Sequence, residues 1–172
     1  MCKRVLKSQT TSQGEIPFYK IGTFGKVANA FISRKLFDEF VDKYSYPQKG
    51  DVLISAAGTI GRVVVFDGKP AYFQDSNIVW LEHDGRRVLN EYLRVYYLSS
   101  PWNVSDGATI PRLYNGDIEG LEIPIPPLPA QREVVARLDA AKAKKEKLVA
   151  TARRGRETAA LMRKAILKEA FE

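Results

Sequence analysis

The side chains that most often perform catalysis or bind metal ions are scarce in this chain. It has one histidine, His83, and one cysteine, Cys2, so a zinc site of Cys/His type cannot be assembled within one copy. A Ser-His-Asp triad would have to use His83, which lies in a turn-like run. Asp117 and Glu119 could bind a metal in principle, but a solvated polar segment is the simpler interpretation. We expect no catalytic residue and no metal site.

Glycine-rich phosphate loops are also missing. Neither Gly-x-x-x-x-Gly-Lys-Ser/Thr nor Gly-x-Gly-x-x-Gly occurs, and the pairs Gly22/Gly25 and Gly58/Gly61 are best explained as turns. The Asn-Pro-Pro-Tyr and Asp-Pro-Pro-Tyr tetrapeptides of adenine methyltransferases do not occur either. We therefore expect no cofactor in this chain.

With catalysis, metal binding and cofactor binding not expected, the charge distribution favours binding of an anion. The net charge is +7, and it divides into +6 for residues 1–35, −5 for residues 36–129 and +6 for residues 130–172. Two basic ends around a mildly acidic middle suit an acidic partner such as nucleic acid. Ordinary solubilising charge explains the composition equally well.

A proline cluster separates two parts of the chain that differ in predicted secondary structure. Four prolines within residues 123–129 exclude a helix and predict a stiff, extended connector. Residues 130–172 contain no proline and are rich in helix formers, so they predict one long helix. Its apolar and small residues recur at alternating intervals of four and three residues, as in a coiled coil. Lys145 and Gly155 are the two exceptions in this pattern. This seam comprises Val134, Leu138, Ala141, Leu148, Ala152, Ala159, Met162 and Ile166.

Such a helix needs a partner of similar length, and residues 1–122 contain none. A solvated single helix is the alternative. Residues 1–122 predict strands at 51–55, 62–66, 71–74 and 77–81, and helices that begin after Ser33 and after Asn90. The expected fold class is α+β: a small, mixed, sheet-rich domain, the connector, and a long coiled-coil helix.

Five stretches in order resemble the DNA specificity subunits of type I restriction–modification systems. They begin with the residues Gly14-Glu15-Ile16-Pro17-Phe18-Tyr19-Lys20-Ile21-Gly22, followed by 49–62, 73–78 and Gly107-Ala108-Thr109-Ile110-Pro111-Arg112-Leu113, and end with 123–132 opening onto the helix. The resemblance covers nearly the whole chain. It departs from the family in having one recognition domain and one helix, so the chain resembles a half subunit.

The resemblance implies a function and partners. In that family each recognition domain reads one half of a bipartite site on double-stranded DNA, and two antiparallel helices set the gap between the halves. Modification subunits, which hold S-adenosylmethionine, dock on the specificity subunit, and restriction subunits add Mg²⁺ and ATP. Two copies of this chain could pair as a homodimer through their helices and recreate a whole subunit.

In a DNA reader, cations hold phosphates, and amide, hydroxyl or guanidinium groups read base edges. Each candidate has a plainer explanation: a frayed N-terminus, surface or strand-edge charge, or a group that satisfies buried backbone. The candidates are Lys3, Arg4, Lys7, Ser8, Gln9, Thr10, Arg34, Lys35, Arg62, Gln74, Ser76, Asn77, Arg112, Tyr114 and Asn115.

The absence of a leader or an apolar run long enough to span a membrane predicts a cytoplasmic protein without membrane contacts. Two competing hypotheses remain at this point. One is a coiled-coil interaction module without a sequence-specific DNA role, and the other is an enzyme such as a nuclease.

Overall fold

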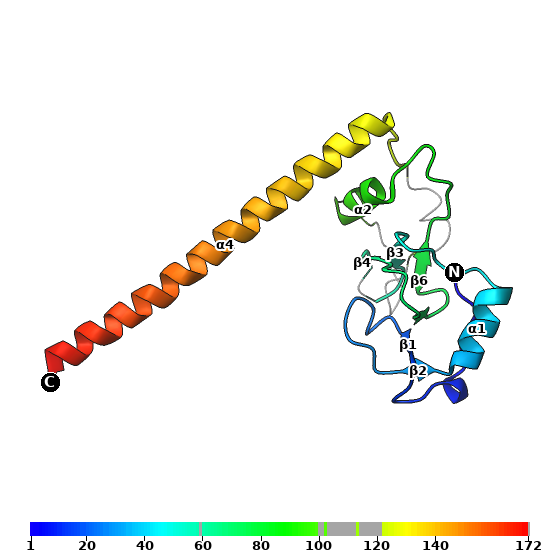
Figure 1. Ribbon diagram of the computed structural model, residues 1–172, viewed down its shortest axis with the longest axis horizontal. Helices are drawn as coiled ribbons and strands as arrows, with labels where there is room; N and C mark the ends of the chain where they lie inside the picture. The colour runs from blue at the N-terminus through cyan, green and yellow to red at the C-terminus, as the bar shows by residue number, and fades with distance from the viewer. Residues whose placement is uncertain (59, 100–101, 103–112, 114–121, 172) are drawn as a thin grey trace. The chain divides into compact units, whose positions relative to one another are not determined.

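A computed structural model describes residues 1–58, 60–99, 102, 113 and 122–171 (Figure 1). The chain separates into two units, Met1–Gln131 and Arg132–Glu172. The first contains all the strands and two α-helices, α1 and α2, among its described residues, and the second is the greater part of one long helix, α4. The expected α+β class is confirmed.

One three-stranded sheet is ordered β2-β1-β5. Strand β1 (Ile16–Tyr19) pairs antiparallel with β2 (Phe31–Ile32) and parallel with β5 (Tyr72–Phe73). The sequence did not predict β1 or β2. Pro17 lies inside β1 and weakens the strand signal, since proline cannot donate to a ladder, and β2 has only two residues.

The other sheet is antiparallel and ordered β4-β3-β6. Its strands are β3 (Val52–Ser55), β4 (Val63–Val65) and β6 (Ile78–Trp80), and with β5 they confirm the four predicted strands within slightly narrower bounds. The turn from β3 to β4 requires glycine at its end. Gly61 has a φ of 74°, and a Cβ there would overlap the ring of Trp102.

Two predicted helices are present. Helix α1 (Arg34–Lys43) has Ser33 at its N-cap, and the Ser33 Oγ accepts a hydrogen bond from the Leu36 N–H at 3.2 Å, as expected. Helix α2 (Asn90–Ser99) differs in one respect, because Asn90 is its first residue and not a preceding cap. The Asn90 Oδ1 lies 2.7 Å from Nε2 of His83, so this histidine serves a structural contact.

The Ser33 cap makes a direct stability prediction. Replacing Ser33 with Ala removes the acceptor for an orphan helix N–H and should lower the free energy of unfolding by about 1 kcal/mol. Urea denaturation would measure the change. The matched control is Ser12→Ala, since Ser12 is exposed and lies outside the helices and strands. Equal stability of the two variants would contradict the capping role.

The core of the first unit is aromatic. Tyr72 is fully buried and packs against Phe37 and Tyr46, and the Tyr46 hydroxyl donates to the Ala71 carbonyl at 2.8 Å. Cys2 belongs to this core, and burial raises the pKa of its thiol to about 11. The thiol therefore stays protonated near neutral pH and is a poor nucleophile.

The connector packs against α2. The hydroxyls of Tyr92 and Tyr96 donate to the carbonyls of Pro124 and Glu122, at 2.9 and 2.7 Å. Helix α4 (Leu128–Phe171) begins two residues before the predicted start at 130, with Pro129 in its first turn as expected. Its 44 residues correspond to a length of about 66 Å.

Gln131 fixes the start of α4 within the first unit. Its side chain is fully buried, accepts from the Leu89 N–H at 2.9 Å, and donates to the carbonyls of Arg87 and Pro126 at 2.8 and 2.7 Å. One amide thus satisfies three backbone groups from two segments. This role could not be predicted from the sequence, because a polar residue after a proline cluster is typical of an exposed helix start.

Candidate nucleic-acid interface

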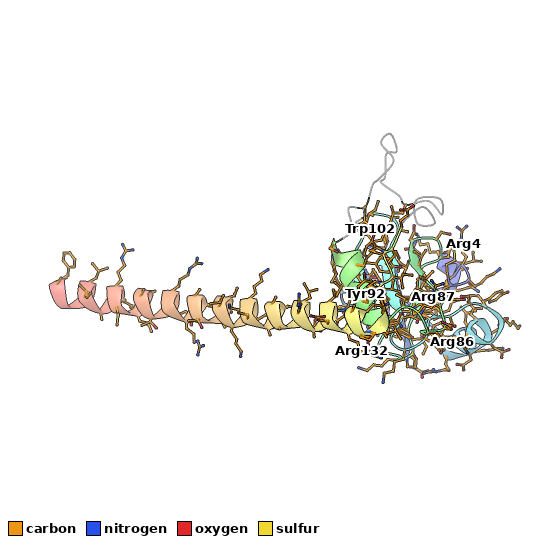
Figure 2. All side chains as sticks on the ribbon, turned by 90° about the horizontal axis from the view of Figure 1, so that it is seen from above. Arg4, Arg86, Arg87, Tyr92, Trp102 and Arg132 are labelled. Atoms are coloured by element: carbon orange, nitrogen blue, oxygen red, sulfur yellow. The ribbon has the colours of Figure 1, made fainter. Side chains whose placement is uncertain are left out.

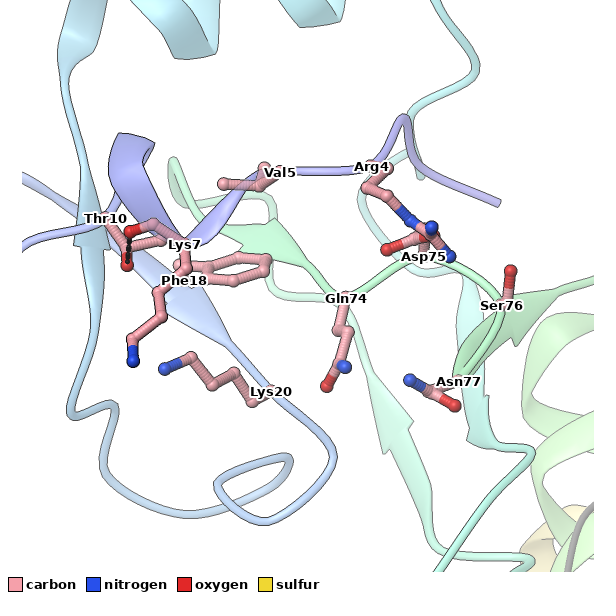
Figure 3. Close-up of a pocket in the computed structure, with 10 residues that line it drawn as sticks. All are labelled: Arg4, Val5, Lys7, Thr10, Phe18, Lys20, Gln74, Asp75, Ser76 and Asn77. Atoms are coloured by element: carbon pink, nitrogen blue, oxygen red, sulfur yellow. Dashed lines mark hydrogen bonds and ion pairs between the residues drawn. The ribbon is translucent and has the colours of Figure 1, made fainter.

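A basic hollow lies where the N-terminal segment meets the loop after β5 (Figure 3). Its volume is about 320 Å³. The lining residues are Arg4, Val5, Lys7, Thr10, Phe18, Lys20, Gln74, Asp75, Ser76 and Asn77. Six of these, Arg4, Lys7, Thr10, Gln74, Ser76 and Asn77, are candidates from the sequence, and the fold brings them together from positions about 70 residues apart.

The parallel pairing of β1 and β5 explains this convergence. Tyr19 lies opposite Phe73 in the ladder, and the Gln74 N–H donates to the Tyr19 carbonyl at 2.9 Å. The residues that follow the two strands, Lys20 and Gln74, therefore leave the sheet at the same edge. Figure 3 shows the ends of Lys7, Lys20 and Gln74 on the same side of the hollow.

The hollow carries an excess of positive charge. Its one carboxylate, Asp75, is paired with Arg4, whose Nε lies 2.9 Å from Oδ2. Lys7 and Lys20 are exposed and form no ion pair with any residue in the described part of the chain. Their ammonium groups remain available for an anion such as a phosphate.

The polar groups of the hollow include an oriented donor. The Gln74 Oε1 accepts from the Ile21 N–H at 2.9 Å, which fixes the side-chain amide. The Gln74 NH₂ group makes no hydrogen bond to the described residues, so it can donate to a ligand. A base edge with acceptors, or a phosphate, suits such a donor.

The loop between β5 and β6 is strained at Ser76. Its φ of 57° is the only positive φ of a non-glycine residue in the described ranges. Backbone strain of this kind is retained where the surroundings enforce it and is common at binding sites. The strained residue lies on the wall of the hollow, between Asp75 and Asn77.

Other candidates from the sequence lie elsewhere. Arg34 pairs with Glu15, Nε to Oε1 at 2.9 Å, and Lys35 is exposed on α1. The Arg62 guanidinium donates to the Phe24 carbonyl at 2.7 Å, so Arg62 joins two loops of the fold. The structure does not bring these three into the hollow.

The remaining N-terminal candidates flank the hollow. Lys3 places its ammonium 4.9 Å from the centre of the Tyr44 ring. Ser8 and Gln9 belong to a single 3₁₀ turn, η1 (Lys7–Gln9), and the Gln9 Oε1 accepts from the Leu6 N–H at 2.8 Å. Arg112, Tyr114 and Asn115 lie outside the described residues.

Sequence reasoning missed Lys20. Lys20 directly follows β1, and the pairing of β1 with β5 places it beside Gln74. Recognition of β1 would have supplied that signal.

A second hollow, of about 510 Å³, is less suited to an anion. Its lining includes the buried rings of Phe24, Phe66 and Phe73. Both signs of charge are present in its wall, with Lys26 and Lys69 against Glu15 and Asp67. The smaller hollow, with its uncompensated lysines, is the better candidate for nucleic acid.

Helix α4 exposes its predicted seam. Val134 and Leu138 are each 41% exposed, and Leu148, Met162 and Ile166 are more so. Figure 2 shows α4 side chains projecting on both visible sides of the helix along its length. Apolar side chains are rarely left in such a row without a partner.

Among the described residues, none of the helices combines the length and the hydrophobicity that a membrane-spanning segment needs. The described residues also contain no group of three histidine, cysteine or acidic side chains that could hold a metal ion.

Comparison with known proteins gives one consistent family. Residues 1–151 match the model for the type I restriction modification DNA specificity domain. A putative type I restriction enzyme specificity subunit from Haemophilus influenzae is 58% identical over 139 residues, which are 81% of this chain and 36% of that protein. The chain thus spans about a third of the length of that relative.

Solved structures share the fold at lower identity. A chain from a study of complex assembly and conformational transition in a type I R-M system aligns with a TM-score of 0.61 at 23% identity, over 86% of this chain and 36% of that one. The S subunit from M. genitalium gives 0.55 at 18%, over 87% and 37%. The HsdS subunit from Thermoanaerobacter tengcongensis gives 0.57 at 19%, over 84% and 34%.

Proposed function

Because the chain belongs to the type I restriction–modification DNA specificity family, we propose that it reads one half of a bipartite DNA target through the basic hollow. The family is the non-catalytic DNA-recognition part of these enzymes. The observation that carries the proposal is the convergence of Arg4, Lys7, Lys20 and Gln74 on one surface.

Division of labour within the hollow follows from its chemistry. Lys7 and Lys20 hold phosphates, since both are exposed and their ammonium groups form no ion pair with a described residue. Gln74 is held by Ile21, so its amide can discriminate between acceptors on base edges. Arg4 is exposed but tied to Asp75, and it contacts DNA if that ion pair opens.

The seam of α4 supports pairing of two copies. The described residues form one compact unit and one long helix, and in this proposal a second copy supplies the facing helix and a second reading unit. Antiparallel helices would place the two reading units at opposite ends of the pair. A two-fold dimer then reads two half-sites of identical sequence in inverted orientation.

The catalytic partners belong to this proposal as well. The modification subunit supplies methyl transfer from S-adenosylmethionine, and the restriction subunit uses Mg²⁺ and ATP. The basic segment of α4 between Lys142 and Arg156 offers these subunits an exposed, charged surface.

Selection from a DNA library tests the proposed function. The chain is mixed with its modification subunit and with random duplexes at 0.15 M salt, and bound DNA is sequenced. We expect enrichment of two short inverted half-sites separated by a constant gap, because direct readout prefers particular base edges. Bound DNA with the base composition of the input library would contradict the proposal.

The same selection tests the alternative, a coiled-coil interaction module without a sequence-specific DNA role, which the exposed seam of α4 favours. Such a module would bind its protein partner and leave the library unselected. A matched selection with the modification subunit alone shows how much enrichment arises without this chain.

A further inference from the structure

We infer that α4 is self-complementary in one antiparallel register, with the two-fold axis level with Ala150 and with Lys145 of one copy facing Gly155 of the other. This inference rests on the pairing proposed above, and it adds which residues meet. In this register, the residue numbers of any two facing seam residues add up to 300. The partner of each seam residue therefore follows from its number.

The seam has only two exceptions to its apolar or small character, and they are equally far from its midpoint. Lys145 and Gly155 lie five residues on either side of residue 150. In the proposed register each lysine stem crosses the partner helix at a position without a side chain, and its ammonium can reach water. Gly155 of one helix thus makes room for Lys145 of the other.

The other layers pair apolar side chains only. Val134 meets Ile166 and Leu138 meets Met162, which places the large side chains together at both ends. Ala141 meets Ala159 in a close-packed layer, and Leu148 meets Ala152 beside the axis. An isologous interface requires this kind of self-complementarity.

Other arrangements give poorer layers. A shift of one heptad in one direction places Lys145 against Leu148 and Leu138 against Gly155, and the opposite shift places Lys145 against Met162. A parallel, in-register pair stacks Lys145 on Lys145, with like charges in one layer, and leaves a gap at Gly155. Charged and cavity-forming layers both destabilise a coiled coil.

The surface available is sufficient for a specific dimer. The large seam residues are exposed by 41% to 65% in α4. Covering them and the seam alanines in both copies removes on the order of 1,200 Å² of surface, at the lower end of the range for specific interfaces.

The register also brings like charges together beside the seam. Lys142 of one copy lies next to Arg156 of the other, because these positions flank the layer of Lys145 and Gly155. Added salt screens this repulsion, so pairing should tighten between 0.05 and 0.5 M salt. DNA binding by the same protein should weaken over that range.

Spin-label distances test the register on the full chain. Single cysteines replace Ala136, Ala150 or Lys164, which are exposed and share the outer face of the helix, in a Cys2→Ala background. At about 1.5 Å per residue, the two labels of a dimer are separated along the axis by about 42 Å for positions 136 and 164, and by about 0 Å for position 150. The sideways contribution is the same at all three positions.

Equal distances for the Ala136→Cys and Lys164→Cys dimers, both longer than for Ala150→Cys, are the expected result. A heptad shift would make them unequal by about 21 Å and would overturn the register while leaving antiparallel pairing and DNA reading intact. Three equal distances would indicate parallel helices and overturn it too. A monomer by light scattering at tens of micromolar would overturn both register and pairing, whereas the DNA selection tests the reading unit separately.

Discussion

The Lys7→Ala/Lys20→Ala double variant is expected to bind DNA about a thousandfold more weakly as a dimer at 0.15 M salt. Each copy loses two ammonium groups of the basic hollow, so a dimer loses four phosphate contacts. Each contact contributes about 0.9 to the slope of log K against log salt, so the slope should become less steep by about 3.6. Fluorescence anisotropy with a labelled duplex between 0.05 and 0.3 M salt measures both quantities.

Lys43→Ala/Lys69→Ala is the matched control. It removes the same charge from exposed positions, but Lys43 pairs with Glu39 and Lys69 with Asp67, away from the hollow. The control should change the slope little. If both double variants weaken binding equally, the loss reflects net charge, and the hollow is not the interface.

The second large effect concerns folding. Gln131→Leu keeps the size of the side chain and leaves the Leu89 N–H and the carbonyls of Arg87 and Pro126 without their partner. A buried group that loses its partner costs about 1–3 kcal/mol, and backbone relaxation recovers part of this. We expect the free energy of unfolding to fall by about 3 kcal/mol, measured by urea denaturation.

The control for this variant is Gln13→Leu, at an exposed position that makes no side-chain hydrogen bond to the described residues. It should change the free energy of unfolding by less than about 0.5 kcal/mol. An unfolding midpoint for Gln131→Leu close to that of the wild type would mean that the buried amide is replaceable.

Local signals predicted much of the fold. Ser33 precedes a run of charged and aromatic residues with helical spacing, and the helix begins after it as expected. Four short runs rich in β-branched and aromatic residues became β3, β4, β5 and β6. The long helix was predicted from a segment rich in helix formers and free of proline after residue 129.

Features that depend on tertiary contacts escaped prediction. Strand β1 contains Pro17 and is held by pairing on both sides, and only that pairing makes Lys20 a neighbour of Gln74. Gln131 looks like any polar residue at a helix start until the segment around Leu89 folds over it.

The candidate site was predicted in part for the same reason. Residue type alone cannot distinguish a cation that serves the fold from one that faces solvent. Arg34 and Arg62 resembled phosphate ligands in the sequence, and each has a partner within the fold, Glu15 and the Phe24 carbonyl. Lys7 and Lys20 form no ion pair within the described part of the chain, and this difference is visible only in three dimensions.

The basic hollow has a consequence for evolution. The side chains of Lys7 and Lys20 form no hydrogen bond or ion pair with the described residues, whereas the neighbouring Gln74 is tied to Ile21. Substitution at the lysines therefore costs the fold little, and substitution at the glutamine disturbs a backbone partner. Affinity for DNA can therefore change at the untied lysines with the scaffold unchanged, whereas a new base preference at Gln74 also leaves the Ile21 N–H in need of another acceptor.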